Sequence, residues 1–288
     1  MIPRDGMATA RARVGEIEVR AADGKLLRGR WWRRPAPRGV IIVSHGFGEH
    51  GGGYQHVAET LGARLELDVI AVDYRGHGRS PGRRGVVGRY HELTEDLLKV
   101  LDWAAHHVPD LDRFVLGHSN GGQVALHVAL REQGLFGGLV VSNPALRVAV
   151  PVSPRKLMMA RLLARCAPWI TLSGEIRADL LTRDPDVREE HRADPLRHGR
   201  ISAPLYFGMI EGGEMLLANA GEIRTPILML LGGQDPVIDP AASREFFDRL
   251  ASVDKTLLIY PKMLHEPFNE LGREQVVDDT VRWLEPRL

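Results

Sequence analysis

The fold of this 288-residue chain is decided by residues 114–122, which read FVLGHSNGG. An apolar strand pattern ends here in a Gly-x-Ser-x-Gly motif, and residues 123–130 then follow the pattern of a helix. This arrangement is typical of a nucleophile elbow, a tight turn that lifts a serine hydroxyl clear of a sheet. Gly117 and Gly121 lack the side chains that would keep strand and helix apart. We therefore expect Ser119 to be a nucleophile at a helix N-terminus, where backbone N–H groups stabilise negative charge.

A nucleophilic serine needs a histidine base and a carboxylate that orients the histidine, and after such an elbow both come later in the chain. The apolar run at 227–231 predicts a buried strand and ends shortly before Asp235. A second run at 256–260 ends shortly before His265. Because the carboxyl ends of parallel strands meet at one edge of a sheet, we expect Asp235 and His265 to lie beside Ser119.

Two other aspartates compete with Asp235 for the role of the acid. Asp239 lies in the same loop, and Asp73 follows another predicted strand. Asp73 precedes Ser119 in the chain, against the usual order, so we expect it to fix its own loop. Structural roles also remain open, because an aspartate before proline is typical of a turn and His265 is placed to cap the last helix.

A glycine-rich turn at 44–53 follows the apolar run at 40–43. The backbone of such a turn approaches a substrate closely, and we expect the amide of Phe47 to donate a hydrogen bond to the oxyanion. The amide of Asn120, directly after the serine, is the expected second donor. The turn lacks the Gly-Lys-Ser/Thr ending of a phosphate loop, which argues against a nucleotide site.

Composition argues against several other classes of protein. With 38 basic and 37 acidic residues the net charge is +1, so no nucleic-acid partner is expected. We see no signal-peptide pattern and no run of roughly 18 apolar residues. The single cysteine, Cys166, suits a reducing compartment, and we expect a soluble cytoplasmic protein. The histidines do not form a His-Glu-x-x-His pattern, so we expect no metal and no cofactor.

Apolar strand runs alternate with helical patterns along the chain, which is typical of an α/β fold with a mostly parallel sheet and helices on both faces. Residues 14–32 predict an antiparallel hairpin at one edge of that sheet. The alternation stops between about 145 and 200, where charged residues and prolines are frequent. We therefore expect a core made of residues 14–144 and 201–288, with a helical cap insertion at 145–200.

Residues 157–165 of the expected cap predict a helix with arginines on one face and a Leu/Met surface opposite. Such a surface usually packs on the core, but part of it is also suited to line a pocket for an acyl chain, because methionine adapts to flexible alkyl groups. The residues expected to contact substrate are Met158, Met159, Leu162 and Leu163 of this helix, with Phe207 and Met209 beyond the cap. Its basic residues are also suited to transient contact with an anionic membrane surface, although a solvated face is the ordinary interpretation.

Five motifs occur together in this chain. They are HGFGEH at 45–50, DYRGHGRS at 73–80, GHSNGG at 117–122, GGQD at 232–235 and the loop that carries His265. Together they resemble the monoacylglycerol lipase branch of the α/β-hydrolases. The middle of the chain, with TRDPDV at 182–187 and DPL at 194–196, is similar to bacterial monoacylglycerol lipases and lysophospholipases. Two residues depart from the family pattern: Asn120 replaces the usual methionine, and Phe47 stands where a smaller residue is common.

This resemblance implies an α/β-hydrolase fold and a serine carboxylic-ester hydrolase that acts on a small lipophilic ester, above all a monoacylglycerol. It also implies that Ser119, Asp235 and His265 form the catalytic triad. The alternatives within the same fold are a lysophospholipase, a general carboxylesterase and a proline iminopeptidase-like amidase. A catalytically inactive, ligand-binding hydrolase fold is the alternative from a different class, and the intact triad argues against it.

Overall fold

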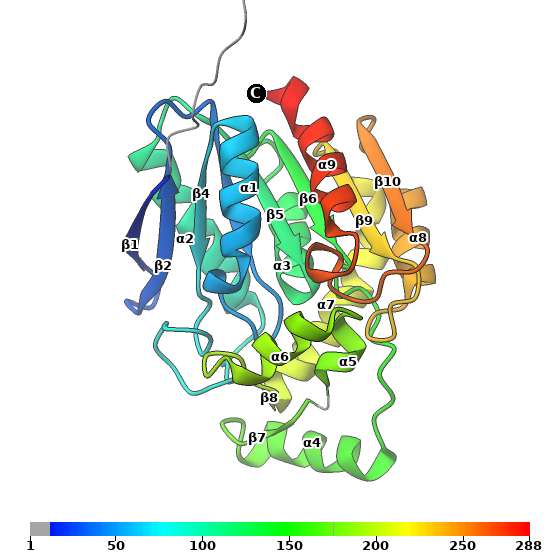
Figure 1. Ribbon diagram of the computed structural model, residues 1–288. Coiled ribbons are helices and arrows are strands. Elements are labelled where there is room, and N and C mark those ends of the chain that lie inside the picture. Colours follow the sequence, from blue (N-terminus) through cyan, green and yellow to red (C-terminus); the bar gives the residue numbers. More distant parts are fainter. Residues whose placement is uncertain (1–11, 175) are drawn as a thin grey trace, which may run out of the picture.

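Eight strands form one central sheet in the computed structural model, which describes residues 12–174 and 176–288. In chain order they are β1 (Arg13–Arg20), β2 (Leu26–Arg33), β3 (Gly39–Ser44), β4 (Leu67–Val72), β5 (Asp112–His118), β6 (Gly138–Ser142), β9 (Ile227–Gly232) and β10 (Lys255–Tyr260). Across the sheet the order is β1-β2-β4-β3-β5-β6-β9-β10 (Figure 1). The predicted hairpin of β1 and β2 lies at one edge and joins β4 in antiparallel fashion, whereas all the other neighbours are parallel.

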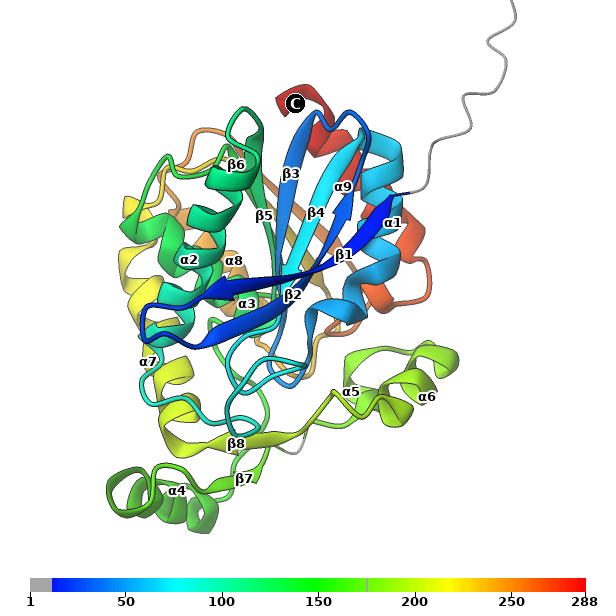
Figure 2. The ribbon, with the colours of Figure 1, turned by 90° about the vertical axis from the view of Figure 1, so that its left-hand side faces the viewer.

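Helices cover both faces of this sheet, which confirms the predicted α/β class. The helices outside the insertion are α1 (Gln55–Leu65), α2 (His91–His107), α3 (Ser119–Arg131), α7 (Ala203–Asn219), α8 (Pro240–Arg249) and α9 (Arg273–Leu284). Figure 2 shows α1 and α9 on one side of the sheet and α2, α7 and α8 on the other. Buried strand residues alternate between the two cores: Val40 and Ile42 face the core of α2 and α3, and Ile41 and Val43 face the core of α1 and α9.

The sheet order explains where a site forms. After β3 the chain passes to β4 on one side, and it then returns to place β5 on the other side of β3. Such a reversal opens a crevice at the carboxyl ends of the two strands, which is where α/β proteins bind ligands. Here these ends lead into the glycine-rich turn and into Ser119.

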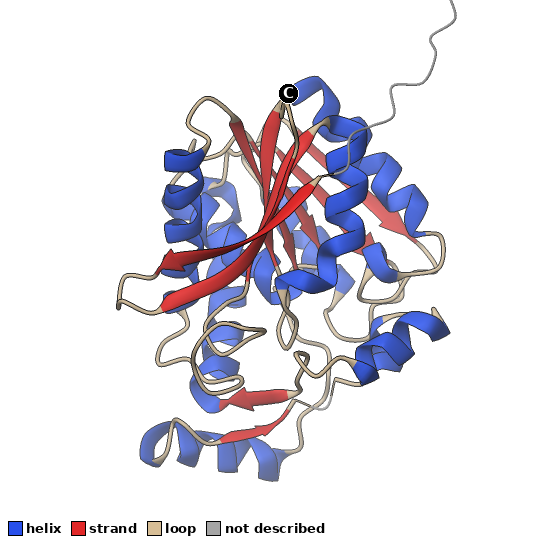
Figure 3. Ribbon diagram, turned by 60° about the vertical axis from the view of Figure 1, so that its left-hand side comes forward, coloured by secondary structure: helices blue, strands red, loops and turns tan. Residues whose placement is uncertain are grey.

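The insertion lies beyond the carboxyl ends of the strands (Figure 1). Its elements are α4 (Pro154–Cys166), β7 (Thr171–Ser173), α5 (Ala178–Leu181), α6 (Pro185–Ala193) and β8 (Arg200–Ser202). The sequence predicts a helical insertion, but the insertion also contains a small antiparallel sheet, in which β7 pairs with β8 (Figure 3). Strands of three residues are too short to produce a recognisable alternation of apolar and polar residues. In the described ranges 12–174 and 176–288, we find no helix with the length and apolar character needed to cross a membrane.

Candidate active site

Ser119 occupies a strained turn between β5 and α3, which follow one another without a linking residue. Its φ angle is 51°, in the left-handed region, where a non-glycine residue costs about 1 to 3 kcal/mol. The neighbouring glycines make this turn possible. A Cβ on Gly121 would lie 2.1 Å from the carbonyl oxygen of Ser44, and one on Gly117 would lie 2.7 Å from the backbone of α3. The elbow geometry thus depends on both glycines.

The structure brings Asp235 and His265 to this serine. Nε2 of His265 lies 2.8 Å from Oγ of Ser119, and Nδ1 lies 2.7 Å from Oδ2 of Asp235. The second oxygen of Asp235 accepts hydrogen bonds from the N–H groups of Val237 and Ile238, at 2.8 and 3.1 Å. With Nδ1 donating to the carboxylate, Nε2 is free to accept the serine proton.

The electrostatics raise the pKa of the imidazole at position 265. Burial by itself lowers the pKa of His265, since it disfavours the charged form. The charge and the hydrogen bond of Asp235, with the charges of Glu266 and Glu49, outweigh burial and hold the pKa above its ordinary value. The histidine is therefore tuned toward accepting a proton.

The rival acids have other partners. Oδ1 of Asp239 caps α8 by accepting a hydrogen bond from the N–H of Ala241 at 2.9 Å. Asp73 accepts hydrogen bonds from the backbone N–H groups of Gly51 and Arg79, both at 2.7 Å, and so fixes its own loop as expected. Asp235 is the carboxylate that contacts the histidine.

Asn143 is a buried positioning residue that the sequence analysis missed. It follows β6 with a left-handed φ of 41°. Its Nδ2 donates to the carbonyl of His265 at 2.7 Å, and its Oδ1 accepts from the N–H of Gly232 at 2.9 Å. It therefore ties the histidine loop to the end of β9. An asparagine directly after a strand of the sheet was the available signal, since polar residues at carboxyl strand ends collect at the site.

The two expected oxyanion donors belong to different segments, the start of α3 and the glycine-rich turn after β3. The N–H of Asn120 is in the first turn of α3, where backbone N–H groups find no acceptor within the helix. Phe47 lines the same pocket as Ser119 and His265.

The turn that carries Phe47 is held from two directions. Glu49 accepts a hydrogen bond from the N–H of Gly46 at 3.0 Å. From the insertion, the N–H of His198 donates to the carbonyl of Gly48 at 2.9 Å. A Cβ on Gly48 would lie only 2.1 Å from the carbonyl oxygen of His198. The insertion therefore packs directly on the expected oxyanion turn.

A polar pocket opens at Ser119 and His265. Its charged and imidazole-bearing lining consists of Glu49, His191, Arg192, Asp194, Arg197, His198, His265 and Glu266. Arg197 of the insertion lies 2.9 Å from a carboxylate oxygen of Glu266 and 3.5 Å from one of Glu49. Burial by itself raises the pKa of Glu49, but His118, Arg197 and two hydrogen bonds outweigh it and hold the pKa well below its usual range. The carboxylate of Glu49 is thus ionised beneath the pocket.

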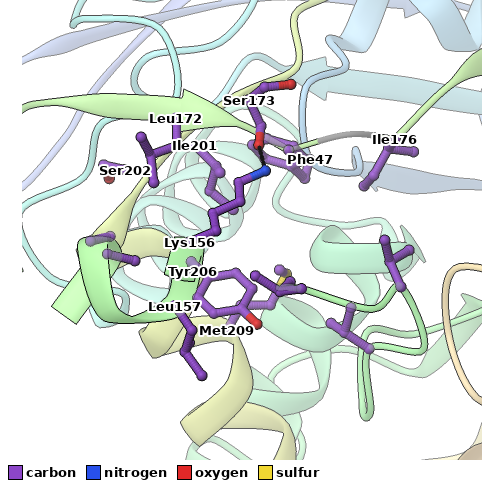
Figure 4. Close-up of a pocket in the computed structure, with 16 residues that line it drawn as sticks. Phe47, Lys156, Leu157, Leu172, Ser173, Ile176, Ile201, Ser202, Tyr206 and Met209 are labelled. Carbon is purple, nitrogen blue, oxygen red and sulfur yellow. Dashed lines mark hydrogen bonds between the residues drawn. The ribbon is translucent and has the colours of Figure 1, made fainter. Parts of the chain in front are cut away.

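An apolar pocket lies on the other side of Phe47 and Ile176, which line both pockets. Figure 4 shows Leu157, Tyr206 and Met209 around it. The other apolar side chains of its wall are Val148, Val150, Val152, Ala160, Leu172, Ile201 and Ala203. Phe47 and Ile176 therefore form the shared boundary between this apolar pocket and the polar pocket that contains Ser119.

Comparison with known proteins identifies the family of this chain. A family model described as serine aminopeptidase, S33, matches residues 35–272. The chain is an α/β-hydrolase of this family. The hydrolase is 38% identical over 255 residues to the monoacylglycerol lipase of Mycolicibacterium smegmatis, which covers 88% of this chain and 90% of that protein. It is 34% identical over 255 residues to the monoglyceride lipase of Homo sapiens, with 87% and 83% covered.

A solved structure resembles the hydrolase over nearly its whole length. The crystal structure of Paleococcus ferrophilus monoacylglycerol lipase has a TM-score of 0.81 and 28% identity, and it covers 96% of this chain and 100% of that one. With these relatives and an intact elbow, the chain is a serine hydrolase.

The structure corrects the expected acyl-chain lining of the hydrolase. The α4 residues that line the apolar pocket are on the face of Leu157 and Ala160. Met158, Met159 and Leu162 point away, with exposed fractions of 68, 49 and 57%. The helix bears apolar residues on both faces, so its sequence pattern does not tell which face lies inward.

The remaining predicted lining residues differ in position. Met209 lines the apolar pocket. Phe207 lines an open groove between α4 and α7, together with Leu162. Leu163 is half-buried.

Among residues 12–174 and 176–288, one group of side chains has the spacing of a metal site. Ligand atoms of Glu49, His118 and Glu266 lie within 4.8 Å of one another. Arg197 contacts both carboxylates, so its guanidinium already supplies a cation to this cluster.

Proposed function

We propose that the protein hydrolyses monoacylglycerols to a fatty acid and glycerol through an acyl-enzyme. One observation carries this proposal: Ser119, in hydrogen-bond contact with His265, opens into a polar pocket that shares Phe47 and Ile176 with an apolar one. An ester with one alkyl chain and a hydroxyl-rich alcohol matches that pair of pockets. The names of the relatives support the same substrate.

The proposed mechanism follows from the contacts around the serine. His265 takes the proton of Ser119 as Oγ attacks the ester carbonyl, and Asp235 stabilises the imidazolium. The amides of Phe47 and Asn120 donate hydrogen bonds to the oxyanion. The imidazolium then protonates the departing glycerol. Water, activated by the same histidine, attacks the acyl-enzyme and releases the fatty acid.

We assign the acyl chain to the apolar pocket and the glycerol to the polar pocket. Residues 145–200 act as a cap that selects the substrate without supplying catalytic groups, and residues 14–144 and 201–288 form the catalytic core. In support, the cap contributes Leu157 and Ala160 to the apolar wall and Arg197 to the polar one, while the triad lies in the core.

The polar pocket favours an ester over an aminopeptidase substrate. An aminopeptidase of this fold needs a carboxylate that is available to the substrate amine. Glu49 and Glu266 are the buried acids at this position, and Arg197 contacts both. A neutral glycerol can exchange hydrogen bonds with such a paired cluster without breaking an ion pair.

The outer face of α4 supports transient contact with an anionic membrane surface. This face of α4 exposes methionine and leucine side chains, and Arg161 and Arg165 lie on the same helix. Just after α4, Trp169 and Ile170 are 51 and 41% exposed. Apolar side chains flanked by arginines are typical of interfacial helices. Co-sedimentation with anionic vesicles tests this contact. It is refuted if replacing Met158 and Trp169 with serine leaves vesicle binding unchanged.

A substrate panel tests the proposed function. The purified protein is assayed with monoacylglycerols, lysophosphatidylcholine, p-nitrophenyl esters and proline p-nitroanilide. We expect the highest kcat/KM with monoacylglycerols and a loss of about 10⁴- to 10⁶-fold in Ser119→Ala. A preference for the lysophospholipid or the anilide would contradict the proposed substrate. Retained turnover in a folded Ser119→Ala protein would contradict the mechanism.

A further inference from the structure

The residue after the nucleophile carries a buried polar side chain in this protein. Asn120 is 2% exposed, and its side chain lies 2.8 Å from the hydroxyl of Tyr90, the residue directly before α2. The same hydroxyl also contacts Oε1 of Gln123, which is fully buried in the second turn of α3. Nε2 of Gln123 in turn donates to the carbonyl of Met209 on α7, at 2.7 Å. A continuous polar network thus joins the elbow to α7.

The Tyr90 hydroxyl is the donor at the centre of this network. It lies 2.8 Å from Oδ1 of Asn120 and within hydrogen-bond distance of Oε1 of Gln123, and the two amide oxygens share its single proton. Gln123 completes the network by donating from Nε2 to the carbonyl of Met209. The tyrosine hydroxyl therefore bridges Asn120 and Gln123, and Gln123 joins both to α7.

Packing fixes the ring of Tyr90 as well as its hydroxyl. Gly208 and Gly212 lie one turn apart on α7, facing the ring. A Cβ on Gly208 would lie 2.4 Å from Cβ of Tyr90, and one on Gly212 would lie 3.3 Å from Cε1. A larger residue at Gly208 would displace the tyrosine. The ring therefore packs against the side of α7 where Gly208 and Gly212 have no side chains.

We propose that Tyr90 is a positioning residue for the oxyanion hole. It acts through Asn120: by holding that side chain, it holds the first peptide of α3, whose N–H is the oxyanion donor. This inference rests on the proposed function, in which the Asn120 amide stabilises the tetrahedral intermediate. Since the elbow is strained at Ser119, a side-chain anchor at the next residue restricts the motion that would relieve the strain.

The test removes the hydroxyl while keeping the ring. In Tyr90→Phe we expect kcat to fall about tenfold with KM unchanged, since a displaced donor weakens transition-state binding more than substrate binding. Affinity for a trifluoromethyl ketone, which forms an oxyanion adduct on the serine, is expected to fall by the same factor. Affinity for an unreactive ether analogue of the substrate is expected to remain unchanged.

A matched control separates positioning from stability. Tyr260→Phe also removes a tyrosine hydroxyl from a hydrogen bond, in this case to Asp279 on α9. We expect it to lower the melting temperature without changing kcat. A thermodynamic cycle with Asn120→Leu adds a second readout: once Tyr90 is phenylalanine, loss of the asparagine side chain should cost little further activity.

Three outcomes would overturn the inference: a Tyr90→Phe enzyme with normal kcat, a rise in KM alone, or additive effects of Tyr90→Phe and Asn120→Leu. These three outcomes differ from the result that would show the proposed function itself to be wrong. If the wild type hydrolyses no monoacylglycerol, the substrate assignment fails. The comparison is then made with p-nitrophenyl butyrate, because every ester passes through the same oxyanion.

Discussion

Among the groups that raise the pKa of His265, the carboxylate of Asp235 has the largest effect. Asp235 opposes the effect of burial and holds the pKa of the imidazole above its ordinary value of 6.5. The base acts only when neutral, so activity rises as the pH passes upward through this pKa. We expect the acidic limb of kcat/KM to have its midpoint above pH 6.5.

The variant Asp235→Asn tests this assignment. Removing the carboxylate removes the main influence that raises the pKa, so the limb should move to lower pH while the plateau falls by about 10⁴-fold. A pH–rate profile of both proteins measures the two effects. An unchanged limb in Asp235→Asn would mean that another group governs the protonation of His265.

Residues of the site differ in how well the sequence predicts them. Ser119, Asp235 and His265 each follow a strand, so strand patterns and chain order predict that they meet. Arg197 and Tyr90 contact the site through side chains from distant segments. No local pattern marks such contacts, because they depend on how the insertion and α7 pack on the core.

At the scale of elements, the inner strands of the sheet were predictable because each contains a short apolar run with clear ends, as in β3 and β9. The orientation of α4 was not, since this helix has only one buried residue, Ala160, and apolar side chains all round. Its inward face is decided by packing on the segments around β7, β8 and α7, which line the same pocket.

This orientation predicts which α4 residues select chain length. Leu157→Ser should depress kcat/KM for long-chain esters more than for butyrate, because each methylene that loses apolar contact forfeits up to about 0.8 kcal/mol. Met158→Ser, on the exposed face, is the matched control and should leave the ratio of long- to short-chain activity unchanged in a detergent-solubilised assay. The opposite result for the two variants would restore the original assignment of Met158 to the acyl pocket.

At the scale of the whole molecule, Arg197 joins the insertion to the core beneath the active site. Its side chain is 14% exposed, and its guanidinium contacts two carboxylates whose side chains are almost fully buried. In Arg197→Ala both carboxylates lose this partner, and we expect a loss of about 3 to 5 kcal/mol in the free energy of unfolding. Urea unfolding measures this change.

Arg192→Ala is the control for this prediction. Arg192 is 59% exposed and pairs with Glu189 on the surface of α6, so its loss should cost less than about 1 kcal/mol. Equal stability changes in the two variants would show that the buried cluster does not hold the insertion in place.

The central claim is that Ser119 carries the acyl group during turnover. The most direct measurement is mass spectrometry of the protein, acid-quenched during turnover of a long-chain monoacylglycerol and mapped by peptide. We predict a mass increase equal to the fatty acyl group on the peptide that contains Ser119, and no such increase in Ser119→Ala. An acyl group mapped to another residue, or turnover of the monoacylglycerol by folded Ser119→Ala at the wild-type rate, would contradict the account.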